Sequence, residues 1–139
     1  VYAIEYFLGR EDTLKEHYML NILFENNILR RAGMGWGNQR PDKITPAIIK
    51  SWSHHNNRAF NYVIRRNIFD RSDANVINIV AADAERLPRM EENTYVQYLG
   101  GDGGRIGQPW ADYKFDEQFP ASVEQALGEK GGKYIFITR

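Results

Sequence analysis

The sequence predicts an α+β fold, in which a mainly antiparallel sheet packs against one long central helix at about residues 46–69, followed by a short C-terminal helix. Three observations lead to this prediction. A helix-start signal precedes apolar residues at helical spacing, short β-branched and aromatic segments lie on both sides of it, and a proline and a glycine frame a short segment near the end.

The central helix is the most strongly patterned element. Thr45 can accept a hydrogen bond from a free first-turn amide, and Pro46 suits the first helical position. Ile49 and Val63 are separated by two heptads, so they would fall on one side of a helix. Further apolar residues widen this side: Ile48, Trp52, Ala59, Phe60 and Ile64.

The remaining elements are short. Residues 16–24 and 28–34 are predicted to form a hairpin, because Asn26 and Asn27 tolerate the positive φ of a two-residue turn. The four-residue spacing of Tyr18 and Ile22 leaves a helix open for the first segment. We find no internal repeat. Further strands are expected at residues 2–8, 76–81, 94–99 and 133–138, and a short helix at 120–128.

Length and composition predict one globular domain over residues 1–139. The chain has no cysteine, which excludes disulfides, thiolate catalysis and cysteine-based metal sites. It has no apolar run of the roughly 20 residues that a membrane helix needs. Its first residues lack the basic flank of a signal peptide. We therefore expect a cytoplasmic protein with no membrane partner.

Charge is distributed unevenly although the formal net charge is zero. Between Arg30 and Arg71 there are nine basic residues and two acids, whereas both flanking regions are acidic. A local surplus of seven positive charges favours a salt-sensitive anionic partner, either a nucleic acid or an acidic protein surface. The predicted binding residues are Arg30, Arg31, Arg40, Lys43, Lys50, Arg58, Arg65 and Arg66.

Two other functions remain open. A small nuclease or toxin-like phosphodiesterase could use His54 or His55 as a general base, with Arg58 stabilising the transition state. Its Mg²⁺-dependent form would draw on acidic residues of the last third: Asp102, Asp112, Asp116 and Glu117. Alternatively, basic and acidic faces could pair in a protein–protein interaction module. No motif specifies a cofactor or a metal site, so none is expected.

Overall fold

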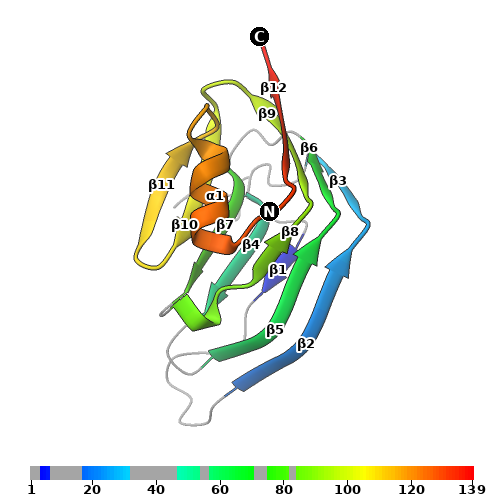
Figure 1. The fold of residues 1–139 in the computed structure, drawn as a ribbon, viewed down its shortest axis with the longest axis vertical. Coiled ribbons are helices and arrows are strands. Elements are labelled where there is room, and N and C mark those ends of the chain that lie inside the picture. Colours follow the sequence, from blue (N-terminus) through cyan, green and yellow to red (C-terminus); the bar gives the residue numbers. More distant parts are fainter. Residues whose placement is uncertain (1–3, 7–16, 32–46, 54–56, 71–74, 82–83) are drawn as a thin grey trace, which may run out of the picture.

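The computed structural model describes residues 4–6, 17–31, 47–53, 57–70, 75–81 and 84–139. Their strands form three sheets (Figure 1). The five-stranded sheet contains β1 (Ile4–Tyr6), β4 (Ala47–Ser53), β7 (Asn75–Ala81), β10 (Asp102–Gly107) and β11 (Trp110–Lys114). The three-stranded sheet contains β2 (His17–Glu25), β5 (Asn57–Arg65) and β8 (Arg89–Glu91). The four-stranded sheet contains β3 (Ile28–Arg30), β6 (Ile68–Asp70), β9 (Thr94–Tyr98) and β12 (Lys133–Ile137).

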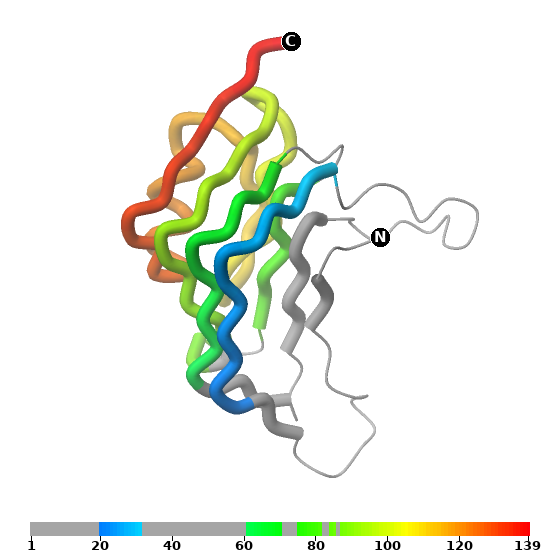
Figure 2. Tube along the Cα trace, turned by 90° about the vertical axis from the view of Figure 1, so that its right-hand side faces the viewer, coloured from blue at the N-terminus to red at the C-terminus, as the bar shows by residue number. Residues whose placement is uncertain are grey.

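The chain winds as a parallel β-solenoid. Each of the first three coils places one strand in each sheet, and the coils stack in parallel register. The strands of the four-stranded sheet run side by side in chain order (Figure 2). The first two coils are offset by 40 residues in both β2–β5 and β3–β6, as the pairing of Arg30 with Asp70 shows. The molecule therefore has a structural repeat, and the expectation of no repeat was wrong.

Stacked side chains fill the interior of the solenoid. Leu29, Phe69, Tyr95 and Tyr134 occupy equivalent positions on the four strands of one sheet. The rings of Phe69 and Tyr95 lie 5.5 Å apart, and those of Tyr95 and Tyr134 stack at 5.1 Å. Parallel pairing puts like residues above one another, so each coil buries its apolar residues against the next coil.

The single α-helix among the described residues, α1 (Phe119–Leu127), covers the end of the stack formed by the last strands (Figure 1). Its buried residues Phe119, Val123 and Leu127 join the same core as the strands. Gly103 of β10 makes this packing possible, because a Cβ there would lie 2.6 Å from the Phe119 ring. Gly128 ends the helix at φ 68°, a conformation that favours glycine.

The predicted fold class was wrong. Residues 46–69 do not form a long helix, since their described part consists of β4, β5 and β6 in three different sheets. The apolar residues that matched helical spacing instead serve separate strands: Ile49 lies in β4 and Val63 in β5. The sheets are also mainly parallel, and β10–β11 is the one antiparallel pair among the described strands. Thr45 and Pro46 lie outside the described residues.

The predicted hairpin was also wrong, although strands occur at both of its positions. β2 and β3 belong to different sheets, and each pairs with the next coil rather than with the other. The short C-terminal helix and the strands near residues 76–81, 94–99 and 133–138 are confirmed, with α1, β7, β9 and β12 beginning one residue from expectation or at the expected residue. No helix within the described ranges is long and apolar enough to cross a membrane.

Candidate functional site

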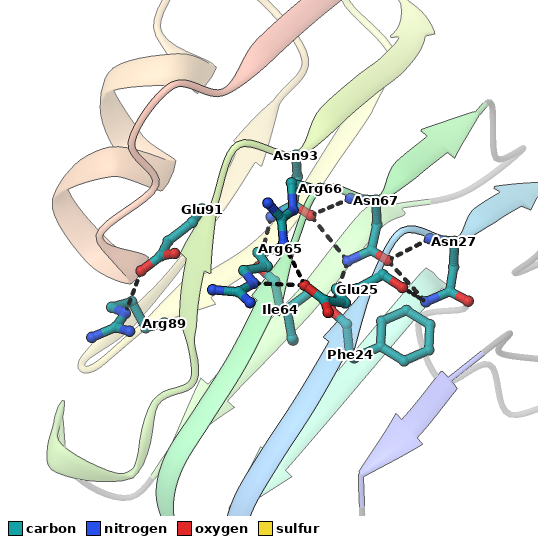
Figure 3. A network of polar contacts seen from close by, with 10 residues as sticks. All are labelled: Phe24, Glu25, Asn27, Ile64, Arg65, Arg66, Asn67, Arg89, Glu91 and Asn93. Atoms are coloured by element: carbon teal, nitrogen blue, oxygen red, sulfur yellow. Dashed lines mark hydrogen bonds and ion pairs between the residues drawn. The ribbon is translucent and has the colours of Figure 1, made fainter.

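The corner between the three-stranded and four-stranded sheets repeats in each of the first three coils. Asn26, Arg66 and Glu92 each adopt a positive φ, between 52° and 59°. An asparagine follows each of them, at positions 27, 67 and 93. The left-handed residue turns the chain into the next sheet, and the asparagine side chain then points along the stack (Figure 3).

These three residues form a hydrogen-bonded asparagine ladder. Asn67 Oδ1 accepts from the backbone N and the Nδ2 of Asn27, at 3.0 and 3.1 Å. Asn93 Oδ1 accepts from the same two atoms of Asn67, at 3.0 and 3.1 Å. Nδ2 of each inner asparagine also donates to a carbonyl of the preceding coil, Phe24 for Asn67 and Ile64 for Asn93 (Figure 3). The ladder thus satisfies polar groups that the corner would otherwise bury unpaired.

Glu129 ends the ladder at the helical end of the stack. Its Oε1 accepts from Asn93 N at 3.1 Å, and its Oε2 accepts from Asn93 Nδ2 at 3.0 Å and from the Tyr95 hydroxyl at 2.6 Å. The residue is only 3% exposed. Burial raises the pKa of Glu129, although the hydrogen bonds from Tyr95 and Asn93 oppose the shift. Burial and the nearby Glu129 carboxylate likewise raise the pKa of the Tyr134 hydroxyl.

Three of the predicted binding arginines form ion pairs between adjacent coils. Glu25 accepts from Arg65 Nε at 2.8 Å and from Arg66 at 2.7 Å (Figure 3). These bonds, with Arg66 first, lower the pKa of Glu25. Arg30 Nε lies 2.7 Å from Asp70 in the next coil. Arg30, Arg65 and Arg66 are therefore matched by acids on the neighbouring coil.

The other predicted residues are dispersed. Arg31 is exposed and follows β3 at φ 52°. Lys50 lies in β4, paired in register with Asn78, and Arg58 lies in β5, paired with Tyr18. Lys50, Arg58, Arg65 and Arg66, which all fall within the predicted helix at 46–69, thus occupy two sheets and a corner. Arg40, Lys43, His54 and His55 lie outside the described residues, so the predicted general bases cannot be placed.

Two of the acidic residues considered for Mg²⁺ are engaged by cations. Asp102 pairs with Lys114, and Asp112 accepts from Arg105 Nε at 2.9 Å and from a terminal nitrogen at 3.2 Å. Across the described part of the chain, no group of three histidine, aspartate or glutamate residues is placed to hold a metal ion. The structure therefore gives no metal centre on the positions it describes.

The β10–β11 hairpin presents an aromatic and charged surface. The Arg105 guanidinium lies over the Trp110 ring at 4.1 Å from its centroid while Asp112 holds its other edge. Trp110 remains 51% exposed. By strand register, Arg105 lies beside Asn78 of β7. The hairpin therefore carries a half-exposed tryptophan whose neighbouring arginine is fixed in place.

A groove of about 350 Å³ lies where this hairpin meets α1. The polar side chains among its described lining residues are uncharged: Gln108, Tyr113, Ser122 and Gln125. Apolar residues complete it: Ala84, Leu87, Ile106, Pro109 and Ala126. The volume falls within the range of small-ligand sites, and the lining suits a neutral polar ligand rather than an ion.

Sequence reasoning missed both the ladder and the hairpin surface. A signal for the ladder existed: Asn27-Ile28 and Asn67-Ile68 are identical 40 residues apart, and an apolar residue follows each pair, Leu29 and Phe69. The third asparagine follows after only 26 residues, so a fixed period hides it. The pairing of Arg105 with Trp110 had no sequence signal beyond proximity. No protein-family model, curated protein or solved structure matches this chain.

Proposed function

We propose that this protein is a binding domain, and that the outward face of the β10–β11 hairpin, which carries Trp110, Arg105 and Asp112, binds a hydroxyl-rich ligand of the oligosaccharide class. The observation that carries the proposal is the half-exposed Trp110, whose neighbour Arg105 lies over its ring and is itself held by Asp112. A sugar ring has C–H groups on its face and hydroxyls around its edge. It can therefore pack on an aromatic ring while its hydroxyls bond to nearby polar groups.

The Arg105–Asp112 pair supplies both kinds of hydrogen-bonding atom. Arg105 uses two nitrogens on Asp112 and keeps other N–H donors, while the Asp112 oxygens can each accept more than one bond. The pair is neutral as a unit, so it favours a neutral ligand over a strongly anionic one. Its geometry is fixed before binding, which lowers the entropy cost of association.

The groove, whose residues Ile106 and Tyr113 lie on the other face of the hairpin, also favours binding over catalysis as its role. None of the described residues that line it is a carboxylate, histidine, lysine or arginine. General acid–base catalysis needs a titratable group within reach of the ligand, and glycoside cleavage commonly needs two carboxylates. Amide and hydroxyl groups such as those of Gln125 and Ser122 suit recognition of a neutral polar molecule.

Titration calorimetry with oligosaccharides of neutral hexoses and of hexuronic acids tests the proposal. Trp110→Ala should weaken binding about tenfold, which is the loss expected for one aromatic contact of about 1–1.5 kcal/mol. Tyr98→Ala is the matched control, because Tyr98 also lies beneath an arginine, Arg139 at 4.5 Å, but in β9 rather than on the hairpin. An affinity unchanged by Trp110→Ala, or no binding of any sugar, would show the proposal to be wrong.

An anionic partner for segment 30–71 remains a second prediction, on different residues. The observation in its favour is the exposure of Arg31 and of the partly paired Arg66, whose side chain is 47% exposed. Salt-sensitive binding of DNA or RNA that is lost in Arg65→Ala plus Arg66→Ala would support it. Cleavage in the same assay would favour the nuclease hypothesis, and salt-sensitive self-association would favour the interaction-module hypothesis.

A further inference from the structure

The two ends of the asparagine ladder differ in their hydrogen bonding. Asn67 Oδ1 and Asn93 Oδ1 each accept two bonds from the asparagine of the preceding coil. Asn27 donates from its backbone N and its Nδ2 to Asn67, and from its Nδ2 also to the Glu25 carbonyl. None of the described groups donates to Asn27 Oδ1. The ladder therefore stops at an open acceptor.

The Nδ2 of Asn27 shows what the first coil lacks. In the inner rungs, this atom donates to a carbonyl of the preceding coil, as Asn67 does to Phe24 at 3.0 Å and Asn93 does to Ile64 at 2.9 Å. Asn27 Nδ2 instead donates within its own coil, to the Glu25 carbonyl at 2.8 Å. The Asn27 amide thus bonds to Asn67 as an inner rung does, but on its other side it bonds to the Glu25 carbonyl in place of a carbonyl of a preceding coil.

Apolar residues are exposed along the same edge. Leu23 is 50% exposed, whereas Val63, its register partner one coil further in, is 7% exposed. Ile28 is 67% exposed, and its partner Ile68 is 36% exposed. Among the described strands, β2 and β3 each pair on one side only, at the outer edge of the stack (Figure 2). An edge of this kind binds another strand readily.

We propose that this edge docks a further parallel β-coil that carries an asparagine at the ladder position. Such a coil supplies a backbone N–H and an Nδ2 to the open Oδ1 of Asn27, as Asn27 itself does for Asn67. The carbonyl three residues before the asparagine of this coil accepts from Asn27 Nδ2, as the Phe24 carbonyl accepts from Asn67 Nδ2. Outward residues of the opposite charge beside Glu25 and Arg30 would extend the pairs that those residues already make.

A second copy of this chain fits the edge poorly. The other end of the stack offers Asn27 no free asparagine donor, because Asn93 already donates to Glu129 there and α1 packs beside the last strands. A two-fold contact would set the strands antiparallel and bring two Asn27 Oδ1 acceptors together without a donor, because both sets of amide donors are already used. The partner must instead offer free donors, as the far edge of an uncapped parallel coil does.

A grafted coil tests this inference. A copy of residues 47–74 inserted directly before Tyr2 preserves the register by which β4 leads to β7, and it places a second Asn67 over Asn27 and a second Arg65 beside Glu25. We expect the edge amides of β2 and β3 to exchange hydrogen about tenfold more slowly and the denaturant midpoint to rise. The control is the same graft with the copy of Asn67 changed to alanine. It should lose part of the slower exchange and part of the rise in the denaturant midpoint.

Two outcomes would overturn the proposal. One is a graft that leaves exchange in β2 and β3 unchanged while β12 stays protected, since the added coil would then not dock. The other comes from the unmodified protein, which does not depend on the graft folding. If its β2 and β3 amides exchange as slowly as those of β5 and β6, the edge is already covered, and sedimentation then shows whether a second copy covers it.

Discussion

The two ends of the solenoid differ in how the exposed face of the terminal coil is covered. At the C-terminal end, α1 fills the last coil with Phe119, Val123 and Leu127, and Glu129 accepts the final ladder bonds. At the N-terminal edge, Leu23 and Ile28 are exposed and the Asn27 acceptor is open. A stack of coils cannot bury its terminal faces by itself, so each end needs its own cover. This chain encodes a cover for one end within its described residues.

The largest expected effect comes from two phenylalanines at opposite ends. Phe119→Ala should lower the free energy of unfolding by about 3–5 kcal/mol, because its ring is fully buried against Phe115 and Tyr95. Phe24→Ala should cost about 1–2 kcal/mol, since Phe24 is half-buried at the edge of the core. Denaturant unfolding measures both. Equal losses would show that the N-terminal edge is as well packed as the cap.

A smaller difference is expected between two rungs of the ladder. Asn67→Ala should cost about 2–4 kcal/mol, because it leaves Asn27 N without its acceptor and removes the side-chain bond to the Phe24 carbonyl in a buried network. Asn27→Ala should cost about 0.5–1.5 kcal/mol, since its outer side already lacks a neighbour. The same unfolding experiment checks this pair. An Asn27 variant as unstable as the Asn67 variant would contradict the open-ended ladder.

The smallest effect concerns pH at the two ladder ends. The folded-state pKa of Glu129 is raised above 4.5, so stability from this group is greatest at low pH and falls as pH rises through the folded pKa. The folded-state pKa of Glu25 is lowered, so its contribution is present above 4.5 and is lost as pH falls through the folded pKa. Glu129→Gln should therefore flatten the stability profile above pH 4.5 only, and Glu25→Gln below it only. Melting temperatures across pH 3–8 measure both profiles, and a Glu129 variant with an unchanged upper slope would contradict the assignment.

Local sequence signals located several elements correctly. Pro120 and Gly128 framed α1, and the β-branched run at residues 76–81 marked β7, because end signals and residue preferences act over a few neighbours. Asn26 was recognised as a residue that tolerates positive φ, and it has φ 59°. These properties belong to the chain itself, before any packing.

Tertiary structure decided what those elements join. The turn at Asn26 and Asn27 could equally have closed a hairpin, and only stacking of the 40-residue coil on the next one sends β2 and β3 into different sheets. The same stacking pairs Arg65 and Arg66 with Glu25, a contact between coils that the charge pattern of the sequence did not indicate. Parallel pairing links residues 26 to 45 positions apart, with a spacing that varies from coil to coil. Because local preferences carry no information on such separations, the sequence determined the strands and the cap helix, and the packing of coils determined the fold and its surfaces.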